Sequence, residues 1–104
     1  MTKQINVTQK HIDNGICSDA YNCPIALAIL EQIDDVYEVE VNGPNITFLS
    51  KSLGYCKVSL DCDTSKIVEQ FQVQFDKNKN VKPFAFELSF EEDDKDYYDY
   101  EPSE

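Results

Sequence analysis

The residues of this 104-residue chain that could do chemistry begin with four cysteines and the single histidine, His11. Together they include enough ligands for a zinc ion, but five residues separate Cys17 from Cys23 and Cys56 from Cys62, unlike the Cys-x2–4-Cys spacing of zinc knuckles. On one strand, Cys56 and Cys62 would lie about 20 Å apart, too far to share a metal. We therefore expect no metal and no cofactor, and keep a zinc or thiol protein built on His11, Cys17 and Cys23 as an alternative.

Two other arrangements could support catalysis. Cys23 precedes a proline at the expected start of a helix, where the helix dipole can lower a thiol pKa, and His11 could then serve as its base. No third orienting group or oxyanion motif accompanies this pair. The paired carboxylates at 34–35 and at 61 and 63 could hold Mg²⁺, yet no basic cluster lies nearby to hold a phosphate substrate. We expect the chain not to be an enzyme.

Charge is the strongest remaining signal. Residues 91–104, here called the acidic segment, carry eight carboxylates and one lysine, which is −7 of the formal −11 and leaves −4 for residues 1–90. A segment so charged and without aliphatic residues cannot bury itself, so the sequence predicts a globular domain over 1–90 and a flexible acidic tail over 91–104. Arginine is absent, and an acidic protein repels nucleic acid and anionic membranes, which argues against direct binding to either.

The elements that must position these residues follow from hydrophobic periodicity. Thr8 is a suitable N-cap for a short helix over Gln9 to Asp13, and Pro24 opens an apolar helix over 24–34. Residues 65–77 fit a helical face, although Phe71 to Phe75 also alternate like a strand, and helix is preferred. Alternation predicts strands at 3–7, 37–41, 45–49, 56–62 and 84–90. The expected fold is α+β, with three to four antiparallel strands covered on one face by the 24–34 and 65–77 helices.

Three stretches resemble a small protein family of phage and bacterial genomes. They are Thr8-x-x-His11-Ile12-x-x-Gly15, Cys23-Pro24-Ile25-Ala26-Leu27-Ala28, and Phe75-Asp76 followed by Val81-x-Pro83-Phe84-x-Phe86-x-Leu88. The resemblance covers most of residues 5–90 and implies a phage- or mobile-element-type small protein. It also implies a helix at 65–77, and the acidic segment lies outside it.

The predicted strands suggest where a partner would bind. If Tyr37, Val39 and Val41 point inward with the apolar residues of the later strands, then several carboxylates share the outer face of the sheet, with Lys57 as the main opposing charge. The acidic segment leaves directly from that sheet and adds tyrosines suited to a partner. The predicted partner-binding residues are Glu38, Glu40, Asp61, Glu87, Glu91, Glu92, Asp93, Asp94, Asp96, Tyr97, Tyr98, Asp99 and Tyr100.

These features favour a non-enzymatic binding protein. We expect a phage-type, anti-CRISPR-like inhibitor that mimics nucleic acid and covers the basic surface of a host nucleic-acid-handling protein. The alternatives are an accessory protein-interaction module with a solubilising acidic tail, and the zinc or thiol protein named above. Because the chain shows neither a membrane-span-length apolar run nor a secretory signal, we expect a cytoplasmic location, in the host cytoplasm if phage-encoded, where the cysteines stay reduced.

Overall fold

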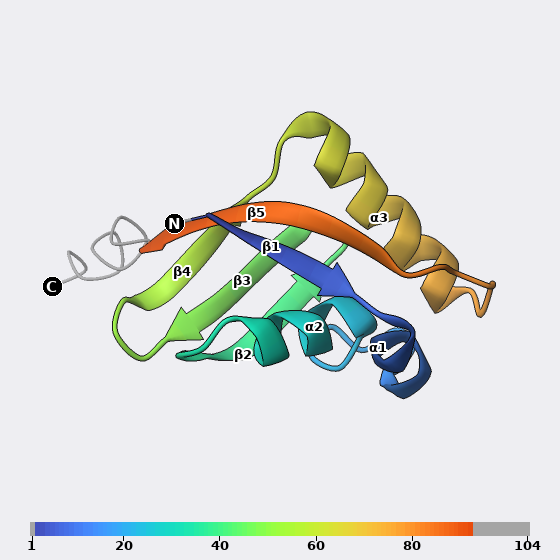
Figure 1. The fold of residues 1–104 in the computed structure, drawn as a ribbon, viewed down its shortest axis with the longest axis horizontal. Coiled ribbons are helices and arrows are strands. Elements are labelled where there is room, and N and C mark those ends of the chain that lie inside the picture. Colours follow the sequence, from blue (N-terminus) through green and yellow to red (C-terminus); the bar gives the residue numbers. More distant parts are fainter. Residues whose placement is uncertain (1, 93–104) are drawn as a thin grey trace, which may run out of the picture.

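The computed structural model describes residues 2–92, as an antiparallel sheet that curls around helices packed on one of its faces (Figure 1). Within this range five strands lie in the order β1-β5-β4-β3-β2. The strands are β1 (Thr2–Val7), β2 (Val36–Asn42), β3 (Asn45–Ser50), β4 (Gly54–Ser59) and β5 (Phe84–Glu92). The predicted α+β class is confirmed. The expected three to four strands are too few, because the N-terminal strand pairs with β5 and extends the sheet.

Three helices occur in the described range: α1 (Gln9–Asn14), α2 (Pro24–Gln32) and α3 (Cys62–Asp76). The short helix predicted from Gln9 to Asp13 is therefore present in addition to the two helices expected to cover the sheet. Helix α2 contacts both β1 and β2, the two edge strands, so the sheet curls around it. Buried side chains of the sheet and the helices form one core, in which Phe48 and Phe90 pack edge to face with ring centroids 5.1 Å apart.

Helix α2 forms as the sequence predicts. Cys23 occupies the N-cap and Pro24 the first helical position, where a missing N–H leaves no hydrogen bond unmade. Ile25 and Ile29 are fully buried, each contributing about 2 kcal/mol of hydrophobic free energy. Gly15 is required by close packing, because a Cβ at that position would lie 2.6 Å from Cδ of Pro24.

Helix α3 confirms the preferred helical prediction for residues 65–77 but begins earlier. The carboxylate of Asp61 accepts a hydrogen bond from the N–H of Thr64 (2.7 Å) and is therefore the N-cap. The predicted strand over 56–62 is accordingly wrong at its end, since β4 stops at Ser59 and Cys62 starts the helix.

A β-bulge in β2 changes the face on which Tyr37 lies. Tyr37 pairs with Leu49 and Glu40 pairs with Thr47, so two residues of β2, Glu38 and Val39, lie opposite the single residue between Thr47 and Leu49. Glu38 has φ +51°, in the left-handed region. The prediction that Tyr37 points inward with Val39 is wrong, because the extra residue reverses the alternation between them.

Both edges of the sheet have hydrogen-bonding partners other than strands. The Gln32 side-chain amide accepts from the N–H of Asn6 (2.8 Å) and donates to its C=O (2.7 Å), as a neighbouring strand would. On the opposite edge, the N–H of Val41 donates to the C=O of Ala20 (2.9 Å). These contacts cover part of each edge and so limit edge-to-edge pairing there.

Candidate partner-binding surface

The outer face of the sheet, opposite the helices, carries side chains that are exposed or half-buried. Alternation along β3, β4 and β5 directs Phe48, Cys56 and Phe90 into the core and their neighbours outward. This face is therefore the broad surface that the fold offers to another macromolecule.

Two tyrosines and a leucine form a row across the outer face. Tyr37 on β2 pairs with Leu49 on β3, which in turn pairs with Tyr55 on β4. Both tyrosines are 41% exposed. We call these three residues the aromatic row. The two tyrosines are large amphipathic side chains of the kind that contribute most to protein interfaces, and Leu49 adds apolar surface between them.

A row of charged and polar residues runs beside the aromatic row. Glu40 pairs with Thr47, Thr47 with Lys57, and Lys57 with Glu91. The two rows are offset by two residues, or about 7 Å, along β3 and β4, and by three residues along β2 because of the bulge. Lys57 thus lies between Thr47 and Glu91, and it partly offsets the negative charge of this row.

The remaining predicted carboxylates are dispersed. Glu87 lies on the outer face but pairs with Gln4 of β1, four residues and about 13 Å from Glu91. Glu38 lies in the bulge of an edge strand. The prediction that Asp61 lies on the outer face of the sheet is wrong, because it caps α3. The structure therefore brings Glu40 and Glu91 into one row and leaves Glu38, Asp61 and Glu87 outside it.

The acidic segment begins inside the sheet. Strand β5 continues through Glu91 and Glu92, two residues further than predicted. Glu91 points to the outer face, whereas Glu92 pairs with the buried Cys56. Since Tyr55 precedes Cys56, the aromatic row lies beside the point where the chain continues into residue 93. The other predicted partner-binding residues lie outside the described part of the chain: Asp93, Asp94, Asp96, Tyr97, Tyr98, Asp99 and Tyr100.

The single histidine braces α1 against α2. Nδ1 of His11 accepts the N–H of Thr8 (2.9 Å), which leaves Nε2 to donate to a carboxylate oxygen of Glu31 (2.7 Å). His11 thus takes the place of the Glu or Gln of a capping box. The hydrogen bond from His11 holds the pKa of Glu31 below its ordinary value. Both ring nitrogens have structural partners, so His11 is not positioned as the base for Cys23.

Cys23 and Cys17, the two thiols considered with His11, have buried or hydrogen-bonded surroundings. Burial raises the pKa of the fully buried Cys23, which is the opposite of the activation that its helix-start position suggested. The Cys17 thiol donates to the C=O of Phe75 (3.1 Å). Across residues 2–92, no cluster of three or more histidine, cysteine or carboxylate side chains has a geometry able to hold a metal ion.

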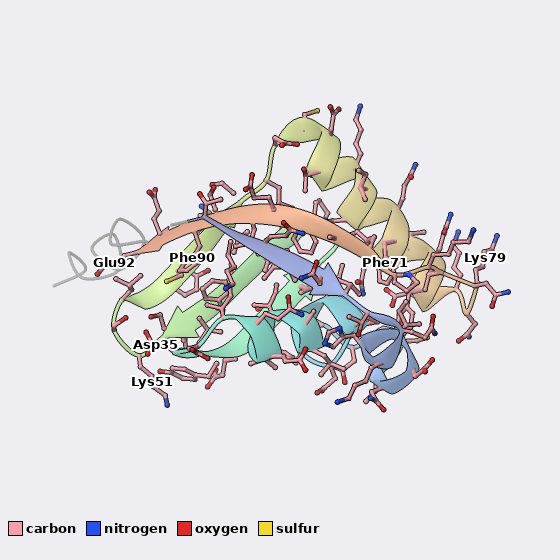
Figure 2. All side chains as sticks on the ribbon, in the orientation of Figure 1. Asp35, Lys51, Phe71, Lys79, Phe90 and Glu92 are labelled. Atoms are coloured by element: carbon pink, nitrogen blue, oxygen red, sulfur yellow. The ribbon has the colours of Figure 1, made fainter. Side chains whose placement is uncertain are left out.

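The Asp34–Asp35 pair also has a structural role. One carboxylate oxygen of Asp35 accepts from the hydroxyls of Ser50 (2.8 Å) and Ser52 (2.5 Å). These hydrogen bonds, led by that from Ser52, lower the pKa of Asp35. Asp35 thereby fixes the turn between β3 and β4, close to Lys51 (Figure 2).

Sequence reasoning missed the aromatic row. The outward orientation of Tyr55 could have been predicted, because Cys56 and Val58 point inward and the alternating residues Tyr55 and Lys57 must then point outward. The orientation of Tyr37 could not, since it depends on the bulge at Glu38.

No protein-family model, curated protein or solved structure matches this chain. None of the helices between residues 2 and 92 is long and apolar enough to cross a membrane.

Proposed function

We propose that this chain is a non-enzymatic binding protein that covers the basic, nucleic-acid-binding surface of another protein. The binding surface consists of the aromatic row, the adjacent row from Glu40 to Glu91, and the acidic segment that continues from β5. The observation that carries the proposal is their adjacency: the aromatic row lies beside the end of β5, where the carboxylates begin.

This arrangement has the composition of an interface with an apolar centre and a charged periphery. Desolvation of Tyr37 and Tyr55 would supply most of the binding energy. Carboxylates around them would accelerate association with a cationic surface and orient the complex, while repelling free nucleic acid. The sequence resemblance adds the expectation that the partner belongs to a phage host, so that the chain acts as an anti-CRISPR-like inhibitor.

The test measures displacement of DNA. Bacterial proteins retained on heparin are incubated with labelled duplex DNA, and the intact chain is titrated in. We expect release of DNA from at least one protein, with an apparent affinity that falls as salt rises. Failure to displace DNA from any such protein would overturn the proposal.

Two variants test whether DNA displacement depends on the proposed binding surface. The double substitution Tyr37→Ala, Tyr55→Ala should weaken displacement by about a hundredfold, roughly tenfold for each lost aromatic anchor. A chain ending at Glu92 should also weaken displacement, because it removes six carboxylates and Lys95, a net −5. Tyr21→Ala is the matched control, since Tyr21 is 52% exposed but lies in the loop between α1 and α2 and belongs to neither row of the binding surface. Displacement that survives both variants would place the binding surface elsewhere.

One outcome would favour the accessory-module alternative. Binding that requires Tyr37 and Tyr55, but does not respond to salt or to loss of residues 93–104, would indicate an uncharged partner docked on the aromatic row.

A further inference from the structure

A groove lies between α3 and the chain that leads into β5. Its volume is about 380 Å³, and Ile67, Phe71, Pro83 and Phe84 provide its apolar lining. The rings of Phe71 and Phe84 have centroids 4.7 Å apart, and Ile67 is 53% exposed. Phe71 belongs to the core and Phe84 packs against it, so Ile67 and Pro83 supply most of the exposed apolar surface of the groove.

Positive charge gathers at the same end of the molecule. Residues 77–82, here called the lysine turn, contain Lys77, Lys79 and Lys82 and no carboxylate. Lys82 lines the groove itself. Among residues 2–92, no carboxylate lies within ion-pair distance of any of these three ammonium groups.

The position of the lysine turn is fixed by the way α3 ends. Asn78 has φ +61°, and the N–H of Lys79 donates back to the C=O of Gln74 (3.0 Å), as in a Schellman motif. The backbone at the start of the lysine turn is therefore held against the end of α3, and Lys82 lines the groove.

The chain itself contains a ligand with matching chemistry. Residues 93–104 carry six carboxylates and the tyrosines Tyr97, Tyr98 and Tyr100. Tyrosine rings suit a groove lined by Phe71 and Phe84, and the carboxylates suit the lysine turn. Figure 2 shows Lys79 and Glu92 at opposite ends of the molecule.

Chain length favours a second copy as the source of this ligand. From Phe84 to Glu92, β5 spans eight steps, or about 27 Å. Even fully extended, the Cα atoms of Tyr97 and Tyr98 reach only about 18 and 22 Å beyond Glu92, and that of Tyr100 about 29 Å. Within one chain only Tyr100 can therefore reach the level of Phe84, and only with every intervening residue extended, whereas all three tyrosines can enter the groove of a second copy.

We infer that residues 93–104 of one copy bind the groove and lysine turn of a second copy. The contact is heterologous, joining different surfaces of the two copies, so it produces head-to-tail rings or open chains rather than a closed two-fold dimer. This inference uses the same acidic segment as the proposed function but a different docking site, because neither the groove nor the lysine turn is part of the outer face.

Complementation between two defective chains provides the test. One chain ends at Glu92 and keeps the groove. The other is full length and carries Lys79→Glu, Lys82→Glu and Ile67→Glu, at exposed positions, so it keeps only the acidic segment. Sedimentation equilibrium should show concentration-dependent assembly of the native chain, monomers for each variant alone, and a 1:1 heterodimer when the two are mixed.

Several outcomes would overturn the inference. A native chain that remains monomeric would do so, as would a mixture in which no heterodimer forms. Self-association of the chain ending at Glu92, equal to that of the native chain, would place the contact elsewhere.

A labelled peptide of residues 93–104 gives a second measurement that does not depend on assembly size. Its fluorescence anisotropy should rise on addition of the chain ending at Glu92. Replacing its three tyrosines by serine, or introducing Lys79→Glu and Lys82→Glu in the protein, should weaken binding by at least about tenfold. Equal binding of the native and serine peptides would refute insertion of the tyrosines into the groove.

Different variants test the proposed function and the proposed self-association. Tyr37→Ala with Tyr55→Ala should leave self-association unchanged, because neither residue lines the groove. Ile67→Glu should leave DNA displacement unchanged, since Ile67 lies on α3 and not on the outer face.

Discussion

The bulge at Glu38 predicts an unusual stabilising substitution, Glu38→Gly. A non-glycine residue at φ +51° costs about 1–2 kcal/mol, because its Cβ approaches the following carbonyl oxygen. Glycine removes that cost but loses about 0.5–1 kcal/mol more conformational entropy on folding. The net expectation is a protein more stable by about 0.5–1 kcal/mol.

Glu40 offers the matched control, because it lies two residues further along the same strand in a regular pair with Thr47. There, Glu40→Gly brings the entropy loss with no relief of backbone strain, and it also removes the hydrogen bond that Nδ2 of Asn42 donates to Glu40 (2.9 Å), so it should destabilise by at least about 0.5–1 kcal/mol. Urea unfolding measures both variants. With a slope of about 1 kcal/mol/M for a domain of this size, the midpoint should rise by about 0.5–1 M for Glu38→Gly and fall by at least a similar amount for Glu40→Gly.

The same experiment can refute the bulge. If Glu38→Gly lowers the midpoint as much as Glu40→Gly does, Glu38 is an ordinary strand residue, and Tyr37 then belongs to the inner face. The slope must stay constant across the variants for this comparison to hold, since a changed slope indicates an altered denatured or native state.

Three further predictions concern other parts of the fold. Asp61→Ala should lower the thermal midpoint at pH 7, and Asp61→Asn should lower it less. The hydrogen bond from the N–H of Thr64 lowers the pKa of Asp61, so the stabilisation from this carboxylate is present above its unfolded pKa near 3.8 and is lost as pH falls through its folded pKa. The difference in thermal midpoint between Asp61→Ala and the native protein should therefore disappear in acid. Peptide mapping after brief alkylation at pH 8 should find Cys62 modified and Cys56 protected. Cys62 is exposed, whereas burial, with a smaller effect of nearby carboxylates, raises the pKa of the Cys56 thiol. Equal labelling of the two cysteines would contradict both placements. Gln32→Ala removes two hydrogen bonds from the edge of β1, so amide exchange at Asn6 should accelerate at least tenfold while amides in β4 change little, and unchanged exchange at Asn6 would show that Gln32 does not cover this edge.

Those parts of the fold that local physics determines could be predicted from the sequence. Pro24 after a capping position, followed by an apolar run, is sufficient to place α2. Alternation from Phe84 to Phe90 is sufficient to place β5, because one face of that strand is buried and the other is not. In both segments one interaction pattern dominates, and no competing one is available.

The errors arise where two local preferences compete. Alternation continues through Leu60 to Cys62 and favours a longer strand. In the structure, the carboxylate of Asp61 instead accepts the N–H of Thr64 and caps α3, so the strand ends earlier. In β2, alternation of Tyr37, Val39 and Val41 predicts one face for all three, but an extra residue in a bulge shifts the register without changing the composition. Residues of a binding surface that are chosen by their strand face carry the same errors. For this reason the predicted partner-binding residues include Asp61, which caps α3, and omit Tyr37, which lies on the outer face.

Strand β5 determines how the opposite charges of this chain are distributed. It begins after the lysine turn and ends in the first carboxylates of the acidic segment, about 27 Å away. That separation exceeds three Debye lengths of about 8 Å at physiological ionic strength, so across the core the two ends scarcely interact. A chain with Lys79 and the acidic segment at the same end would neutralise itself. In this one, Glu91 lies at the far end of β5 from the lysine turn and cannot neutralise it at short range, so the lysine turn can attract an acidic segment of another molecule.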